Sequence, residues 1–163
     1  MNKAYLSLGS NRGNRSANLE RAIELLSEWI GSVAAVSSTY ETPPWKMIDK
    51  TNFFNCVLLI ETELPAEQLL DTVILVESMM GRQRTSQKYE PRIIDIDILF
   101  FNDEVIHTTD LDVPHPLIQE RRFVLQPLAE IAPAFIHPTL KKNILQLLDE
   151  CEDKSEIRKQ VSK

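Results

Sequence analysis

Residues 91–103 read PRIIDIDILFFND, and the fold can be worked out from the strand that they form. Side chains alternate between the two faces of a strand, so its even positions form an apolar row: Ile94, Ile96, Ile98 and Phe100. Asp95 and Asp97 project together from the other face, with Cα atoms roughly 6.6 Å apart. The rest of that face is apolar: Ile93, Leu99 and Phe101. A buried face does not hold two unpaired charges, so we expect a cation between them.

The segments before this strand predict a ferredoxin-like fold of the α+β class. Apolar runs predict strands over 3–9, 32–42 and 53–62, and helical spacing predicts helices over 17–31 and 65–81. The order β-α-β-β-α-β is that of the split βαβ fold. We therefore expect an α/β sandwich with a mostly antiparallel sheet and both helices on one face.

The rest of the chain is expected to form a C-terminal helical extension. A short strand is predicted at 104–107, a helix around 117–131 interrupted by Pro127, and another helix near 139–150. The charged tail, 151–163, is expected to fray. At 163 residues the chain is expected to be one domain, 1–163, with its core over about 3–138.

Composition narrows the function classes. The chain is 43% hydrophobic and carries a net charge of −6, which argues against nucleic acid or an anionic membrane as partner. No signal peptide or membrane-spanning run is recognisable, and two cysteines suggest neither a disulfide framework nor a zinc site. We expect a cytoplasmic protein with small-molecule substrates.

Cations and carboxylates converge around the strand quoted above. Mg²⁺ prefers carboxylate oxygens and is usually shared with substrate phosphates, which makes Asp95 and Asp97 candidate ligands. Several arginines precede or follow the strand, and guanidinium groups bind phosphate bidentately: Arg82, Arg84, Arg92, Arg121 and Arg122. Together they suggest a triphosphate with its metal. The alternatives are a solvated strand face and arginines paired with surface acids.

Three other features are candidates for binding. Glu77 lies at the edge of a helix's apolar stripe and His115 between two prolines, where each could bind a nucleotide or be an ordinary boundary or capping residue. Asn55 lies on an apolar strand face with Phe53, and it could read the edge of a flat heterocycle held between aromatic rings. Its alternative is a core amide bonded to backbone. Residues 42–45 and Phe123 could complete such a slot.

Several separated motifs resemble one family. PRIIDIDIL, preceded by GRQR and followed by VPHPLIQERRFVLQPLAEIAP, is similar to the 6-hydroxymethyl-7,8-dihydropterin pyrophosphokinases of folate biosynthesis. LGSNRGN at 8–14, YETPPW at 40–45 and FFNCVLLIET at 53–62 match the same family. The likeness spans about residues 5–138.

The resemblance implies transfer of the pyrophosphoryl group of ATP to the pterin's hydroxymethyl oxygen, with release of AMP. Asp95 and Asp97 would then hold two Mg²⁺ ions, and Arg82 and Arg92 would stabilise the transferring group from a loop that closes over the site. It also implies a nucleotide pocket: Glu77, Arg84, Tyr89, Arg92, Ile98, His115 and Arg121. The pterin-binding residues it implies are Thr42, Pro44, Trp45, Phe53, Asn55 and Phe123.

The chain departs from the family pattern at several positions: Ile74, Tyr89, Glu90 and Pro116. Glu90 stands where a small residue is usual, and its charge would oppose the arginines unless it points outward. Two other functions are compatible with the residues, namely a two-metal nucleotidyl transferase and a ferredoxin-like regulatory module that binds a nucleotide or metabolite. Association with other folate-pathway enzymes is a further expectation.

Overall fold

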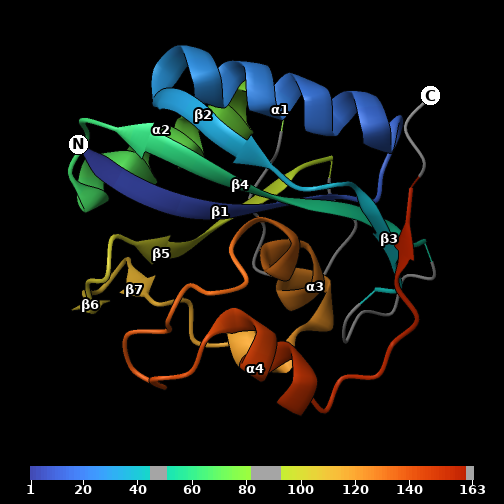
Figure 1. Cartoon of the computed structure of the whole chain (residues 1–163). Coiled ribbons are helices and arrows are strands. Elements are labelled where there is room, and N and C mark those ends of the chain that lie inside the picture. The colour runs from blue at the N-terminus through green and yellow to red at the C-terminus, as the bar shows by residue number, and fades with distance from the viewer. Residues whose placement is uncertain (45–50, 82–92, 161–163) are drawn as a thin grey trace.

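A six-stranded antiparallel sheet lies between two layers of helices in the computed structural model, which describes residues 1–44, 51–81 and 93–160 (Figure 1). Five strands follow one another across the sheet: β5 (Asp95–Phe101), β1 (Asn2–Ser10), β4 (Phe53–Thr62), β3 (Tyr40–Thr42) and β8 (Arg158–Lys159). The sixth, β2 (Gly31–Val36), pairs with the other half of β4. The predicted ferredoxin-like order and antiparallel sheet are confirmed.

Helices α1 (Arg15–Trp29) and α2 (Ala66–Met79) cover one face of the sheet, as predicted. The Asn14 side chain caps α1 by accepting a hydrogen bond from the Ala17 N–H (3.0 Å), and Pro65 is the N-cap residue of α2. The apolar sides of both helices pack with the even-numbered residues of β1 and β4 into a first core. Its members include Leu6, Leu8, Leu26, Leu58, Ile60 and Val73.

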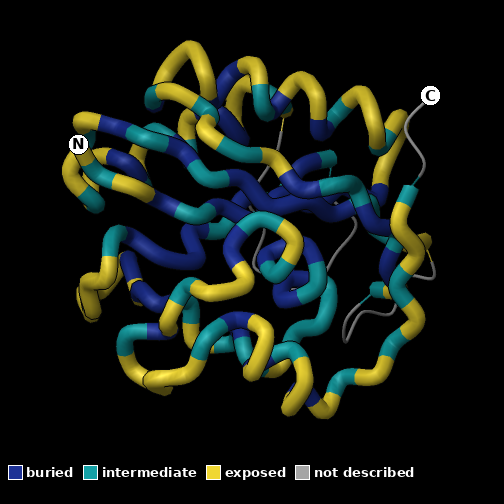
Figure 2. Tube along the Cα trace, viewed as in Figure 1, coloured by how far each residue is buried: buried dark blue, intermediate teal, exposed yellow. Residues whose placement is uncertain are grey.

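The C-terminal extension covers the opposite face. A hairpin of β6 (Ile106–His107) and β7 (Asp112–Val113) and a 3-10 turn (Ile118–Glu120) lead to α3 (Arg122–Ile131) and α4 (Ile144–Glu150). These two helices and the sheet bury a second core, visible as the dark blue inner side of the lower layer in Figure 2. Its members include Val57, Leu99, Phe100, Leu125, Leu128, Ile144 and Leu147.

The predicted helix boundaries in this extension need three corrections. The helix predicted from 117 begins at Arg122, because Ile118–Glu120 form a separate 3-10 turn. Pro127 lies inside α3 and does not interrupt it, because the buried side chains of Val124, Leu125 and Leu128 hold the helix against the sheet. The last helix begins at Ile144, since Asn143 and Gln146 form a capping box there.

The predicted strand 32–42 is in fact two strands, β2 and β3. At Ser37 the chain leaves the regular ladder: its N–H donates to the Val57 carbonyl, and its hydroxyl oxygen accepts from the Val57 N–H, each at 2.9 Å. A side chain thus replaces one backbone group of the ladder, and strand pairing resumes at Tyr40.

Strand β5 contains a β-bulge that overturns part of the predicted alternation. Leu6 pairs with Ile98 and Tyr5 with Phe100, so Leu99 is an extra residue on β5. Leu99 and Phe100 therefore both enter the second core, while Phe101 enters the first. The apolar row therefore ends at Ile98 and does not include Phe100. The prediction that Phe101 shares a face with the aspartates is wrong.

The prediction that the C-terminal tail is frayed is wrong for residues 151–160. Cys151 is buried, and β8 pairs with β3 through Tyr40–Lys159 and Glu41–Arg158. The Gln160 N–H donates to the Thr39 carbonyl at 2.8 Å. This segment is therefore the outermost strand of the sheet together with the connection that leads to it.

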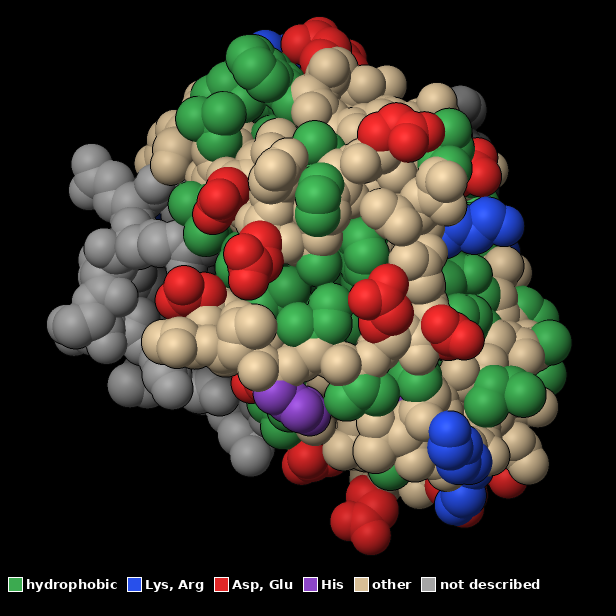
Figure 3. Space-filling model, turned by 90° about the vertical axis from the view of Figure 1, so that its left-hand side faces the viewer, with side chains coloured by type: hydrophobic (Ala, Val, Ile, Leu, Met, Phe, Trp, Pro, Cys, Tyr) green, Lys and Arg blue, Asp and Glu red, His purple; other side chains and the backbone are tan. Residues whose placement is uncertain are grey.

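On one face of the molecule the acidic side chains of the described residues are dispersed between apolar ones and form no single cluster (Figure 3). Among the residues that the structure describes, no helix is both long and apolar enough to cross a membrane.

Helix α3 is tied to the sheet by a buried tyrosine. The Tyr40 hydroxyl donates to Glu130 Oε1 at 2.5 Å, and Glu130 Oε2 accepts from the Ser38 N–H (2.7 Å) and hydroxyl (3.0 Å). Burial, with the hydrogen bond to Glu130, raises the pKa of Tyr40 to about 12.

We expect Tyr40→Phe to lower the free energy of unfolding by about 1.5–3 kcal/mol, because a hydrogen bond to a charged group is lost. Urea unfolding of the variant measures this. Tyr5→Phe is the control, because Tyr5 packs by its ring against Phe100 and Phe135. An equal loss in both variants would contradict a specific role for the Tyr40–Glu130 bond.

Candidate functional site

One end of the sheet's second face is polar, and the candidate site lies there. Strand pairing places Tyr40, Asn55, Gly9 and Asp95 in one row across β3, β4, β1 and β5. Asn55 and Asp95 are two strands apart, so their Cα atoms are separated by roughly 10 Å. The structure thus brings the amide and the carboxylates, which the sequence placed on two separate strands, to one surface.

Gly9 makes this arrangement possible. The first strand was expected to end at this residue, but β1 runs on to Ser10, and Gly9 lies inside it between Asn55 and Asp95. A Cβ atom at Gly9 would lie 2.5 Å from Asn55 Oδ1 and 3.4 Å from the Phe53 ring. The Asn55 side chain therefore lies over the backbone of Gly9, where another residue would displace it.

Asn55 is held by a side chain and not by backbone. It is buried, and its Nδ2 donates to Thr42 Oγ1 at 2.6 Å. The Thr42 side chain is buried as well. Neighbouring strands thus fix the orientation of the amide, which is what a group that reads the edge of a heterocycle needs.

Asp95 and Asp97 lie half-buried on this same face. The described residues contain no cluster of three or more His, Cys, Asp or Glu that could hold a metal ion. Two carboxylates alone fit Mg²⁺, because that ion commonly takes one or two carboxylates and fills its other positions with phosphate oxygens and water. The site fits a metal that arrives with a phosphorylated substrate better than a permanently enclosed ion.

His115 lies within range of the charges of Arg121, Asp95 and Asp112. The backbone N–H of His115 donates to the Leu99 carbonyl (3.0 Å). The ring Nδ1 accepts from the Leu117 N–H (3.1 Å), so the ring proton is on Nε2. Burial, with the charge of Arg121, lowers the pKa of His115 to about 4, although Asp95 and Asp112 act in the opposite direction. The imidazole is therefore a neutral donor at physiological pH.

Glu77 and Ile98 lie along the outer edge of β5. Glu77 is buried, and its Oε2 accepts from the Ile96 N–H at 2.9 Å. This bond caps a backbone group at the sheet's edge, so one carboxylate oxygen has a structural role that the sequence did not predict. The Ile98 side chain belongs to the first core, which leaves its backbone as the part able to meet a ligand.

A cavity of about 230 Å³ adjoins the polar row. Thr42, Pro44 and Phe123, all predicted pterin-binding residues, line it together with Pro43. Its remaining wall comes from the segment after α4: Asp153, Ser155 and Ile157. These three residues were not predicted from the sequence, because their segment is charged and has no apolar periodicity that would indicate packing against the rest of the protein.

Five predicted site residues lie outside the described residues: Trp45, Arg82, Arg84, Tyr89 and Arg92. Gly9 was missed as a site residue, although its place in LGSNRGN and the scarcity of glycine were signals that could have found it.

The model of one protein family, 7,8-dihydro-6-hydroxymethylpterin-pyrophosphokinase (HPPK), matches residues 5–133. This chain belongs to the HPPK family. The family recognised from the sequence and the enzyme class that goes with it are confirmed.

Curated relatives agree with this membership. The chain is 41% identical over 150 residues to the 2-amino-4-hydroxy-6-hydroxymethyldihydropteridine pyrophosphokinase of Aquifex aeolicus, covering 92% of each chain. It is 45% identical over 131 residues to the Bacillus subtilis enzyme of the same name, covering 80% of this chain and 78% of that one. It is also 41% identical to the folic acid synthesis protein FOL1 of Dictyostelium discoideum, covering 85% of this chain but only 21% of that protein.

The fold has solved counterparts. The wild-type HPPK-DHPS of Plasmodium falciparum with SDX-DHP aligns with a TM-score of 0.76 at 21% identity, covering 92% of this chain and 43% of that one. The same protein with pterin and p-hydroxybenzoate aligns with a TM-score of 0.74 at 20% identity, covering 91% and 43%. These likenesses establish the fold of this HPPK chain, which spans less than half of those proteins.

The titration of His115 can be measured directly in this HPPK chain. We expect its ring signals in NMR to stay those of a neutral imidazole until the pH approaches about 4, in protein free of metal and nucleotide. The chain has three histidines, so the loss of one signal in His115→Gln assigns it.

Stability should follow with a defined sign. Between pH 6.5 and about 4 the unfolded state takes up a proton that the native state does not, so His115 lowers stability as the pH falls through this window. We expect urea unfolding of His115→Gln to lack this part of the pH dependence. A titration midpoint of His115 near pH 6.5 in the folded protein would contradict the lowered pKa.

Proposed function

We propose that this chain transfers the β,γ-pyrophosphoryl group of ATP to the hydroxymethyl oxygen of 6-hydroxymethyl-7,8-dihydropterin, giving AMP and the pterin diphosphate for folate biosynthesis. The observation that carries the proposal is the row across the sheet, in which the Asn55 amide and Asp95 flank Gly9 on one face, with Asp97 two residues further along β5 on the same face. We further propose that residues 1–163 form a single pyrophosphokinase domain.

The pterin binds at the Asn55 end of the row. The Asn55 amide offers a donor and an acceptor to the edge of the pterin, and Phe53 and Phe123 supply aromatic faces above and below it. Residues 42–45 complete the rim, with Thr42 and Pro44 contacting the ring system and Trp45 assigned by resemblance alone. Because Gly9 leaves room beside Asn55, the substrate can lie with its hydroxymethyl group toward β5.

The phosphates bind at the other end. Asp95 and Asp97 would hold two Mg²⁺ ions, which would neutralise charge that develops on the phosphates during transfer. Arg82 and Arg92 stabilise the transferring group, again by resemblance. Attack by the hydroxymethyl oxygen in line with the bond to AMP needs no protein nucleophile, so positioning is the main task of the site.

The nucleotide lies along the outer edge of β5. The Nε2–H of the neutral His115 and the Arg121 guanidinium are donors to its phosphates or ribose, and the Ile98 backbone meets its base. Glu77, whose Oε2 accepts from the Ile96 N–H, contributes its carboxylate as an acceptor for a nucleotide hydroxyl. Arg84 and Tyr89 complete the pocket by resemblance.

Association with other folate-pathway enzymes is also proposed. Its support is that the Plasmodium falciparum chains named HPPK-DHPS and the Dictyostelium discoideum protein are much longer than this chain. In them a region like this one is joined covalently to other parts.

The reaction is tested by mixing the protein with ATP, Mg²⁺ and 6-hydroxymethyl-7,8-dihydropterin and separating the nucleotide products by chromatography. We expect AMP only when pterin and metal are both present. Release of pyrophosphate from ATP would favour a nucleotidyl transferase, and binding of ATP without turnover would favour a regulatory module.

Asp97→Asn should lower AMP formation by about a thousandfold or more, because it removes one charge from the metal ligands at constant size. Asp103→Asn is the matched control: it makes the same change just beyond the end of the same strand, at an exposed position. Similar rates for the two variants would refute the metal assignment.

Gly9→Ala should raise the KM for the pterin by about tenfold or more and leave the KM for ATP within about twofold, because the new Cβ displaces the Asn55 amide. A double-mutant cycle makes the test specific: in an Asn55→Ala background, Gly9→Ala should have little further effect on the pterin KM. Additive losses would show that Gly9 acts by another route.

A further inference from the structure

The segment after α4 is anchored at both of its ends. At its start the Cys151 N–H donates to the Leu148 carbonyl at 3.3 Å, and at its end β8 pairs with β3. Figure 1 shows it running from the lower helical layer up to the edge of the sheet. It lies beyond residue 133, where the match to the family model ends.

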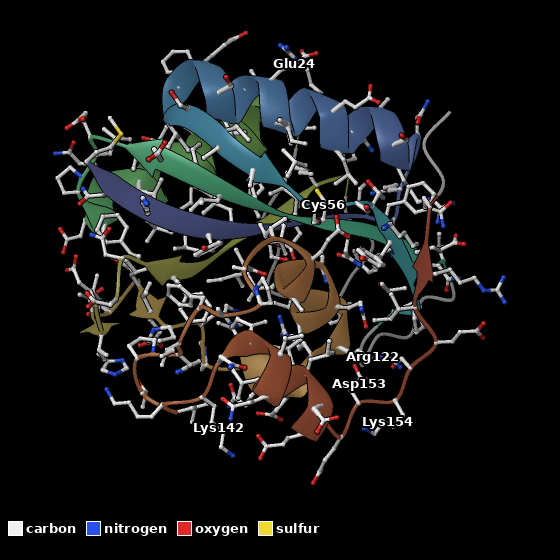
Figure 4. All side chains as sticks on the ribbon, in the orientation of Figure 1. Glu24, Cys56, Arg122, Lys142, Asp153 and Lys154 are labelled. Atoms are coloured by element: carbon white, nitrogen blue, oxygen red, sulfur yellow. The ribbon has the colours of Figure 1, made fainter. Side chains whose placement is uncertain are left out.

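Between these anchors the segment caps helix α3. Arg121 occupies the N-cap position of α3 but makes no side-chain capping bond. Asp153 takes this role from 31 residues away, since its Oδ2 accepts from the Arg122 N–H at 3.2 Å. Figure 4 shows Asp153 and Arg122 next to each other at this junction.

Neighbouring bonds hold Asp153 in place. Its Oδ1 accepts from the Ser155 N–H (3.0 Å) and from the Ser155 hydroxyl, and Arg122 Nη1 donates to the Ser155 carbonyl at 3.0 Å. Burial alone would raise the pKa of Asp153, but the hydrogen bonds from Ser155 and Arg122 outweigh it and lower the pKa. The cap is therefore a carboxylate, which also suits the positive end of a helix dipole.

Phe123 follows Arg122 directly, and its ring faces the same cavity as this segment. The cavity is bounded by Thr42, Pro44 and Phe123 on one side and by Asp153, Ser155 and Ile157 on the other. The first turn of α3 determines where the Phe123 ring lies, and Asp153 holds that turn.

We infer that Asp153, Ser155 and Ile157 form the outer wall of the pterin pocket and that Asp153 is a positioning residue, which holds Phe123 against the heterocycle by capping α3. This inference rests on the proposed function, because it takes Phe123 as one face of the pterin site. The ligand class is a planar bicyclic heterocycle. The segment sets affinity for that substrate and not the chemistry of transfer.

Steady-state AMP formation tests the inference. We expect Asp153→Ala to raise the KM for 6-hydroxymethyl-7,8-dihydropterin by about fivefold or more, with kcat and the KM for ATP within about twofold of wild type. Asp153→Asn keeps an oxygen for the Arg122 N–H and should recover part of the affinity. Glu156→Ala is the matched control, because Glu156 belongs to the same segment but is exposed and pairs with Arg158 (3.2 Å).

The outcomes are distinct. A pterin KM for Asp153→Ala equal to that of wild type, or an equal shift for Glu156→Ala, overturns the inference and leaves the proposed function intact. If Asp153→Ala does not fold, Ile157→Ala decides, since it opens the same wall while keeping the cap: a raised pterin KM supports the inference and an unchanged one overturns it. Wild-type protein that forms no AMP overturns the proposed function itself, and the inference with it.

Discussion

The bulge at Leu99 divides the second face of the sheet into an apolar half and a polar half. A regular strand would have alternated Leu99 and Phe100 between the two cores, but the extra residue turns both toward α3 and α4. Only two residues earlier, Asp97 shares this face and is half-buried. One strand can therefore hold a helix layer at one end and present carboxylates at the other.

The polar half depends on close packing of backbone and side chain. Gly9 allows the Asn55 amide to lie against β1, and Thr42 fixes that amide from β3. Each of these residues comes from a different strand, so the site exists only when all the strands are paired in register. A slip of one residue in β4 would turn Asn55 toward the first core and bring Phe54 to the site.

Helix α3 connects the second core to the candidate pterin pocket. Glu130, near its C-terminal end, receives bonds from Tyr40 and Ser38, and the N–H of Arg122 at its other end is capped by Asp153. Both contacts join α3 to residues distant in sequence. The helix that carries Phe123 is thus held at both ends by polar contacts, in addition to its apolar packing.

The sequence by itself determined the order of the elements, and it placed Asp95 with Asp97 on one strand face and Phe53 with Asn55 on another, since these pairs follow from periodicity within short segments. Only strand pairing brought the two pairs to one surface. The sequence also contained the motifs of the HPPK family. Only the tertiary structure decided where alternation is broken, in β5 at Leu99 and between β2 and β3 at Ser37, because a bulge depends on the register of a neighbouring strand. The same holds for Gly9 and for the segment after α4. Gly9 lies against Asn55, 46 residues away, and Asp153 caps Arg122, 31 residues away. No local pattern in the sequence encodes such distant contacts.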